Sequence, residues 1–168
     1  MSECKKLIIA AVQGYALGGG CGLTAAADFA IASVDAQFGL PEVDLDIFPM
    51  TIMPPIVRAV SMRKALELLF LGERVNAQEA KQIGLVNQVV PKEELYCTAE
   101  ALAGKLSLIS NLALEMGKEA YQISQSMEYF SAIDYLSNIM AIVTGHAQAQ
   151  QSITDFLDRK KSRKKADS

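Results

Sequence analysis

The feature that most constrains the fold is an apolar run at residues 7–12, LIIAAV, which is followed directly by a glycine-rich segment at residues 13–20. Because apolar and polar residues do not alternate in the run, it predicts a strand that is covered on both faces, as in a parallel sheet. The glycines predict a turn, and the small residues at 21–27 predict a helix that packs closely. This order places helix-terminal N–H groups at the carboxyl end of a sheet, where open α/β folds bind ligands.

The glycine turn favours an anion or a developing oxyanion, because the first N–H groups of a helix are unpaired and the helix dipole is positive there. Glycine also lets a ligand approach the backbone closely. The spacing (Gly14, then residues 18–20, then Gly22) does not match G-x-G-x-x-G, and no Gly-Lys-Ser/Thr follows, which argues against dinucleotide and P-loop sites. Spacing alone leaves two interpretations open: a ligand-binding turn, or a turn that only allows tight helix–strand packing.

The remaining sequence predicts strands first and helices afterwards. Further strands are expected at residues 29–33, 36–39 and 85–90, with a turn that begins at Pro41. Helical patterns begin near residue 51 and comprise a helix at 61–71 that ends at Gly72, a capping pattern at 76–79, and three or four helices after Pro91 with breaks near residues 110, 126 and 145. We therefore divide the chain into an α/β part at residues 1–108 and a helical part at residues 109–168.

Composition excludes several classes of protein. With 51% hydrophobic and 21% charged residues, the chain is typical of globular domains and not of disordered ones. The longest purely apolar run is far shorter than the roughly 18 residues that a membrane span needs, and the amino end shows no signal-peptide pattern. The three cysteines lack metal spacing and the chain has a single histidine, His146, which disfavours a zinc site, a disulfide framework and a Ser-His-Asp triad. We expect a reducing compartment, a cytoplasmic location and no membrane association.

Charge is distributed unevenly along the chain. The last ten residues contain six basic residues and one acidic residue, whereas the other 158 contain 10 basic and 18 acidic ones. An acidic body argues against nucleic acid as the partner. The basic tail has two interpretations, a solvated terminus, or a phosphate-binding element or a nuclear or nucleic-acid patch.

Three carboxylates, Glu42, Asp44 and Asp46, alternate with apolar residues after Pro41. On a strand all three would share one face, as in a site for a hard cation, although hydrated surface carboxylates are commoner. A single carboxylate beside an apolar pocket would instead be a general base. The pattern does not decide between these interpretations.

Several motifs in a fixed order resemble the crotonase superfamily, also called the enoyl-CoA hydratase/isomerase family. They are IAAVQGYALGGGC at residues 9–21, AQFG at 36–39, PE at 41–42, LGER at 71–74, AQEA at 77–80, GLVNQVVP at 84–91 and FLDRKK at 156–161. The resemblance runs from about residue 6 to residue 161 and covers the family's C-terminal two-thirds. It implies an α/β fold: a crotonase-like ββα spiral core that is partial because its N-terminal part is absent, followed by a C-terminal helical oligomerisation region.

The resemblance also implies a reaction. Family members bind acyl-CoA thioesters and stabilise an enolate-like anion with two backbone N–H groups, and here the matching donor is the N–H of Gly19. Glu42 matches the glutamate that moves protons at the acyl chain. The residues that match substrate-binding positions are Gly18, Gly20, Phe156, Arg159 and Lys160. The resemblance implies no cofactor apart from the coenzyme A of the substrate, no metal, and a homotrimer or hexamer, in the cytoplasm or, in a eukaryote, in the mitochondrial matrix.

Departures from the family pattern refine this expectation. Gly22 stands where the hydratases have a second glutamate, Asp46 stands where many members have glycine, and residues 48–50 replace the hydratase loop. We therefore expect single-glutamate proton transfer in preference to two-glutamate hydration. The alternatives are a catalytically incomplete family fragment that binds CoA or assists assembly, and an unrelated phosphate-binding α/β domain. We also expect the 168-residue chain alone to be inactive or prone to association unless oligomerisation covers its missing part.

Overall fold

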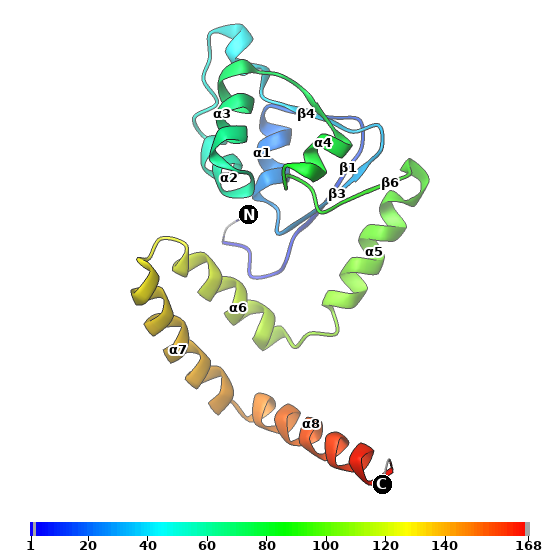
Figure 1. Cartoon of the computed structure of the whole chain (residues 1–168), viewed down its shortest axis with the longest axis vertical. Helices are drawn as coiled ribbons and strands as arrows, with labels where there is room; N and C mark the ends of the chain where they lie inside the picture. Colours follow the sequence, from blue (N-terminus) through cyan, green and yellow to red (C-terminus); the bar gives the residue numbers. More distant parts are fainter. Residues whose placement is uncertain (2, 167–168) are drawn as a thin grey trace. The chain divides into compact units, whose positions relative to one another are not determined.

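The computed structural model describes residues 1 and 3–166, with the side chains of all of these except residues 159 and 161–166. The chain divides into two compact units, Met1–Ile109 and Ser110–Ser168. All the strands of the described residues lie in the first unit, and the described part of the second unit consists of helices (Figure 1). The architecture is mixed α/β, with more helix than strand.

The first sheet is parallel and has the strand order β1-β3-β6. Its strands are β1 (Ile9–Val12), β3 (Phe29–Ser33) and β6 (Gln88–Val90). The central strand β3 is buried along most of its length, whereas β1 lies at the edge of this sheet and is half-buried throughout. The expected parallel strand at residues 7–12 is confirmed over Ile9–Val12, and so is its cover on both faces: Ala10 and Val12 pack against one hydrophobic cluster, Ile9 and Ala11 against another. Because β1 has a neighbouring strand on one side only, its free edge leaves it half-buried.

A second small sheet has the strand order β2-β4-β5. Its strands are β2 (Tyr15–Leu17), β4 (Gln37–Gly39) and β5 (Val75–Asn76). Strand β2 pairs parallel to β4 and lies inside the segment predicted as a turn. Gly14, at a φ of 67°, allows the chain to leave one sheet and enter the other within two residues.

Four helices and a 3₁₀ turn complete the layer around these sheets. They are α1 (Gly19–Ala26), the turn η1 (Pro41–Leu45), α2 (Met53–Ala59), α3 (Met62–Leu71) and α4 (Ala77–Gln82). The predicted signals act as expected: prolines occupy the first turn of α2, Gly72 ends α3 at a φ of 65°, and Asn76 and Glu79 form a capping box on α4.

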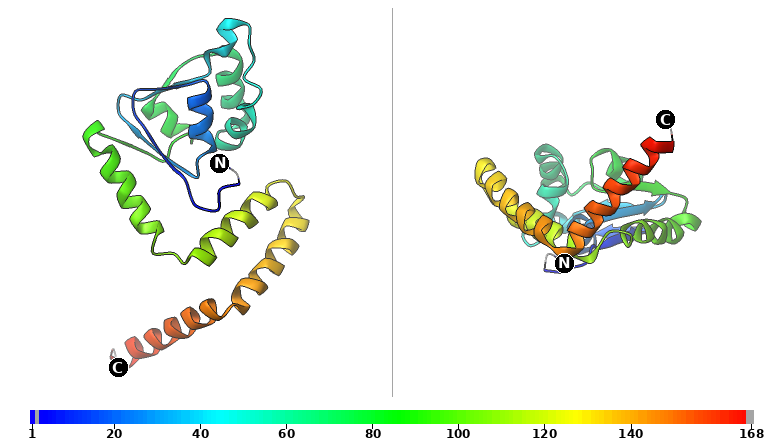
Figure 2. Two further views of the ribbon diagram at one scale, coloured as in Figure 1. Left: turned by 180° about the vertical axis from the view of Figure 1, so that it is seen from behind. Right: turned by 90° about the horizontal axis from the view of Figure 1, so that it is seen from below.

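The hydrophobic core of the first unit lies between the strands and α1–α4. Its largest fully buried side chains include Phe38, Leu40, Ile56, Leu68 and Leu69. Helix α1 packs against β2 and α2, and the left view of Figure 2 shows α1, in blue, beside the teal helix α2. A smaller cluster, formed by Ile31, Val90 and Leu95, holds α5 (Leu95–Leu106) on the first sheet after the short 3₁₀ turn η2 (Lys92–Glu94).

The second unit consists of α6 (Asn111–Ser124), α7 (Tyr129–Gly145) and α8 (Ala147–Ala166). The predicted breaks near residues 110, 126 and 145 are confirmed. The Ser110 hydroxyl accepts a hydrogen bond from the N–H of Ala113, and the Glu128 carboxylate caps the start of α7. Many large apolar side chains of these helices are exposed, among them Tyr121, Tyr129, Phe130, Met140, Ile142 and Phe156. Within the part of the chain that the structure describes, no helix is both long and apolar enough to cross a bilayer.

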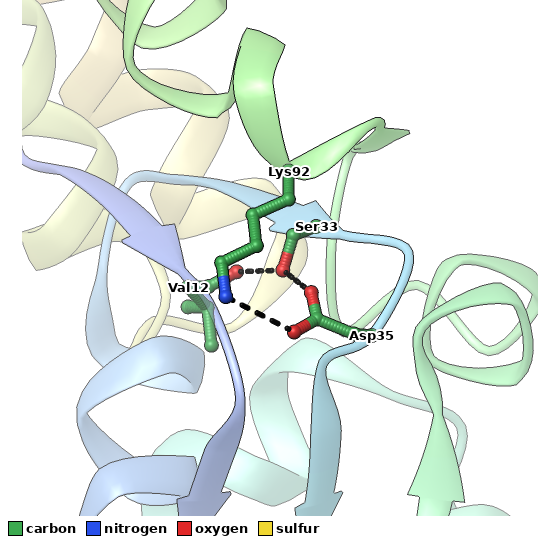
Figure 3. A network of polar contacts seen from close by, with 4 residues as sticks. All are labelled: Val12, Ser33, Asp35 and Lys92. Atoms are coloured by element: carbon green, nitrogen blue, oxygen red, sulfur yellow. Dashed lines mark hydrogen bonds and ion pairs between the residues drawn. The ribbon is translucent and has the colours of Figure 1, made fainter.

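Polar contacts tie together the ends of the strands of the first sheet (Figure 3). The Ser33 hydroxyl donates to Asp35 Oδ1 at 2.5 Å and lies 3.4 Å from the carbonyl oxygen of Val12. The Nζ of Lys92, in η2, lies 3.9 Å from Asp35 Oδ2. The hydrogen bond from Ser33, assisted by the positive charge of Lys92, lowers the pKa of Asp35 below its ordinary value of 3.8.

We predict that the Asp35 carboxylate stabilises the fold above about pH 4 and loses this effect as the pH falls through its lowered pKa, because only the charged form holds both contacts. The wild type should therefore have the higher free energy of unfolding than Asp35→Asn at pH 6–7, and the difference should shrink on acidification. Urea unfolding between pH 3 and pH 7 measures it. The matched control is Glu93→Gln, which neutralises an exposed carboxylate of η2; an equal pH dependence in both variants would contradict the prediction.

Cys21 differs from the other two cysteines in its surroundings. Its side chain is completely buried in the core of the first unit, whereas Cys4 and Cys97 are exposed. Burial, and secondarily the negative charge of Glu42, raises the pKa of the Cys21 thiol to about 11, against an opposing hydrogen bond with the Gly39 backbone. The thiolate, which is the reactive form, is therefore scarce at Cys21 at neutral pH.

We predict that a thiol reagent at pH 8 labels Cys4 and Cys97 rapidly and labels Cys21 only after unfolding. Stopped-flow absorbance with a disulfide reagent, with and without guanidinium, measures the two phases. The control is the variant Cys4→Ser/Cys97→Ser, in which Cys21 is the last thiol of the chain. A fast native phase in that variant would show that the thiol is accessible.

Candidate functional site

The start of helix α1 is held in an unusual conformation by Gly18. This residue has a φ of 55° and a ψ of −121°, a combination that residues with a side chain rarely adopt. Its N–H donates to the carbonyl oxygen of Gly39, at the end of β4, at 2.9 Å. The helix therefore begins at Gly19 beside the end of β4, and the first N–H groups of α1, those of Gly19 and Gly20, have no acceptor within the helix.

The carboxylate of Glu42 lies against this helix start. A Cβ atom added at Gly18 would be 2.7 Å from Glu42 Oε1, so the glycine leaves room for the carboxylate. The other oxygen, Oε2, is buried and has no hydrogen-bond partner among the described residues. A buried carboxylate oxygen without a partner is costly in a folded protein, which indicates a group that is available to a ligand or a proton. The structure thus brings together Gly18, Gly19, Gly20 and Glu42.

The turn η1 determines where this carboxylate lies. Glu42 is the second residue of η1. The turn closes with hydrogen bonds from the N–H groups of Asp46 and Ile47, which both donate to the backbone carbonyl oxygen of Glu42. Asp46 has a positive φ of 56°, which Asp tolerates better than most residues. Because the segment is a 3₁₀ turn and not a strand, its three carboxylates do not alternate along one strand face. The described residues contain no group of three potential ligands that could hold a metal ion.

Position 22 is closed by a neighbouring side chain. Gly22 is buried one turn after Gly18 in α1, and a Cβ atom added there would be 2.6 Å from the Cβ of Ile52, the residue that precedes α2. Real Cβ atoms essentially never approach so closely, so the site has no room for a second glutamate at this position unless Ile52 moves. Sequence reasoning missed Ile52, because this contact depends on how α2 packs against α1.

The predicted CoA-binding residues lie in the second unit. Phe156 and Lys160 are exposed residues of α8, and Arg159 belongs to the same helix but its side chain is outside the described atoms. Their role toward the substrate stays a prediction, as do the catalytic roles of Gly19 and Glu42. Gly39 is a further residue that sequence reasoning did not single out as part of the site, although it lies within the AQFG motif.

Comparison with known proteins points to one family. The enoyl-CoA hydratase/isomerase family profile matches residues 1–166. A short-chain-enoyl-CoA hydratase of Clostridioides difficile is 40% identical over 153 residues, which are 90% of this chain and 98% of that protein. A probable mitochondrial enoyl-CoA hydratase of Dictyostelium discoideum is 35% identical over 95% of this chain and 58% of its own length.

Solved structures agree with these relatives. The enoyl-CoA hydratase of Mycobacterium smegmatis has a TM-score of 0.91 at 31% identity, over 94% of this chain and 62% of that chain. Human enoyl-CoA hydratase domain-containing protein 3 has a TM-score of 0.89 at 33% identity, over 94% and 62% of the two chains. These similarities confirm the crotonase-like α/β fold.

The lengths matched differ between relatives. This chain covers nearly all of the Clostridioides difficile protein but only about three-fifths of the Dictyostelium discoideum relative and of both solved structures. Which part of the longer proteins it covers stays a prediction. From the profile match, the identities and the fold together, this chain belongs to the enoyl-CoA hydratase/isomerase family, the crotonase superfamily.

Proposed function

We propose that this chain contains the central acid–base site of an enzyme that acts on acyl-CoA thioesters through an enolate-like intermediate. The observation that supports this most directly is the position of Glu42: its carboxylate lies on Gly18 at the start of α1, with one oxygen buried and without a partner among the described residues. Family membership and the relatives named as enoyl-CoA hydratases supply the substrate class.

In the proposed reaction, the N–H of Gly19 donates to the thioester carbonyl oxygen. Glu42 takes a proton from a carbon of the acyl chain, and the electrons of that C–H bond move toward the carbonyl, which becomes an enolate-like oxyanion. The start of α1 stabilises this charge because its backbone N–H groups and dipole are already oriented toward it. The protonated Glu42 then returns the proton to a different carbon, which shifts the double bond without loss or gain of atoms.

The remaining parts of the proposal concern the CoA moiety and its surroundings. Phe156, Arg159 and Lys160 are proposed to bind the adenine and phosphates of CoA, because an aromatic ring and cations suit a nucleotide with several phosphates. No cofactor or metal is proposed. Three free cysteines favour a reducing location, the cytoplasm or, given the mitochondrial name of one relative, the mitochondrial matrix.

We predict that Glu42→Gln lowers turnover of an enoyl-CoA thioester by about 100-fold or more, the usual contribution of a general acid–base group, because the amide cannot accept the proton. Affinity for the CoA thioester, measured by isothermal titration, should change little, because Gln keeps the size of the side chain. The assay uses the full protein in its native assembly.

The matched control for this prediction is Asp44→Asn, which neutralises an exposed carboxylate two residues further along η1. It should leave turnover near the wild-type value. Unchanged turnover in Glu42→Gln would remove the proposed mechanism. Binding without any turnover in the wild type would instead favour the catalytically incomplete CoA-binding protein considered above.

We also propose that the chain forms a homotrimer or a hexamer through α6–α8, because these helices expose many large apolar side chains. Sedimentation equilibrium should show the oligomer. Phe130→Glu, which places a charge on one of the most exposed rings of α7, should shift the protein to smaller species, whereas Asn138→Glu on the same helix should not. A stable wild-type monomer would contradict this proposal.

A further inference from the structure

Two glycines at the start of α1, the N-cap residue Gly18 and Gly22 within the helix, lie against different residues. Gly18 and Gly22 are four residues apart, and the N–H of Gly22 donates to the carbonyl oxygen of Gly18 at 3.1 Å, so the two positions follow each other by one helical turn. Glu42 lies over the first glycine and Ile52 over the second. A carboxylate therefore covers one of these two backbone positions, and a β-branched apolar side chain covers the other.

Ile52 fills the volume into which a side chain at position 22 would project. The added Cβ at Gly22 would be 2.6 Å from Ile52 Cβ, and closer still to Cγ2, whereas the distance to Cα is an ordinary 3.7 Å. These atoms are not the mobile end of a long side chain: Cβ is attached to the backbone, and a β-branched residue has a restricted χ1 angle. Ile52 is also the N-cap residue of α2, which lies against α1. Displacing Ile52 would therefore shift the backbone at the start of α2, which costs free energy of folding.

We propose that Ile52 is the specificity-determining residue for the type of reaction at this site. Its Cβ and Cγ2 prevent residue 22 from having a side chain, so that Glu42 remains the acid–base group that α1 and η1 supply. This proposal rests on the proposed function, because it assumes that Glu42 exchanges protons with the acyl chain. It places the determinant of the reaction type at Ile52, the N-cap residue of α2, and not at Gly22 itself.

The chemical consequence follows from counting protons. Moving a double bond needs one group that removes a proton and returns it elsewhere. Adding water to an enoyl thioester forms a C–O bond and a C–H bond and breaks the carbon–carbon π bond and one O–H bond of water. When both new bonds form in one step, one group takes a proton from water while a second group supplies a proton to carbon. A second carboxylate one turn along α1 from Gly18 would supply the additional group, and Ile52 occupies its place.

Stability measurements test the contact without any assay of activity. Gly22→Ala should lower the Tm by about 4 °C or more in the wild-type background, the usual scale for overpacking a buried position. The same substitution should remain destabilising in the Ile52→Ala background, because the Cβ of residue 52 is retained. In the Ile52→Gly background, Gly22→Ala should no longer lower the Tm. It should raise the Tm slightly, because alanine is a better helix former than glycine. Glycine is acceptable at an N-cap, so Ile52→Gly keeps the start of α2.

Activity measurements test the consequence. In the full protein, Gly22→Glu together with Ile52→Gly should gain hydration of a crotonyl thioester by at least about tenfold over the wild type, within the contribution of an added acid–base group. Gly22→Glu alone and Ile52→Gly alone should not gain it. The matched control is Gly22→Gln with Ile52→Gly, which has the same size and no carboxylate.

The outcomes separate this proposal from the one on which it rests. If Glu42→Gln loses turnover but Gly22→Ala lowers the Tm equally in the wild-type, Ile52→Ala and Ile52→Gly backgrounds, the proposed function is retained and the role of Ile52 is overturned. Hydration gained equally by Gly22→Glu alone, or absent from the double variant, would also overturn it. Unchanged turnover in Glu42→Gln would overturn the proposed function, whereas the change of sign in the Tm series would still establish the contact.

Discussion

The hydrogen bond from the Gly18 N–H to the Gly39 carbonyl oxygen holds the site together. It fixes the start of α1 beside the end of β4. Because Gly39 is only three residues before Glu42, the same contact also limits where the carboxylate can lie. A backbone with the φ and ψ angles of Gly18 is needed to make it, and a side chain at Gly18 would collide with Glu42 Oε1. One hydrogen bond thus positions both the start of α1 and the Glu42 carboxylate.

The core makes this link rigid. Cys21 follows the glycines in α1, and Phe38 and Leu40 flank Gly39; all three side chains are completely buried in the same cluster. Burying a side chain of the size of Phe or Leu stabilises a fold by about 1.5–3 kcal/mol, and close packing leaves few alternative arrangements. The residues beside the site are therefore apolar for a structural reason, whereas Glu42 is the exception whose buried oxygen has no partner among the described residues.

Much of this arrangement could be predicted from the sequence, because its signals are local. The end of α3 at Gly72 and the capping box at Asn76 depend on residues a few positions apart, and the structure confirms them. The predicted glycine turn is confirmed in part, because strand β2 occupies residues 15–17 within it. The ordered motifs were also sufficient to identify the family.

The parts that could not be predicted depend on tertiary packing. Strands β2 and β5 are too short, at three and two residues, to give a period-2 pattern, and they exist because they pair with β4. The half-exposed state of β1 reflects its place in the strand order and not its composition. The contact between Gly22 and Ile52 joins two helices whose packing no sequence pattern records.

The C-terminal glycine of α3 has a consequence for how this sequence tolerates mutation. A Cβ atom at Gly72 would be 2.7 Å from Cγ2 of Val43, the residue next to Glu42 in η1. Gly72 lies 30 residues from Glu42 in the sequence, yet a substitution there adds atoms beneath the turn that holds the carboxylate. Substitutions should therefore be poorly tolerated at glycines where an added Cβ atom would meet a neighbouring side chain. Gain of a single methyl group at one of them is a route to loss of function that a search for altered charges would overlook.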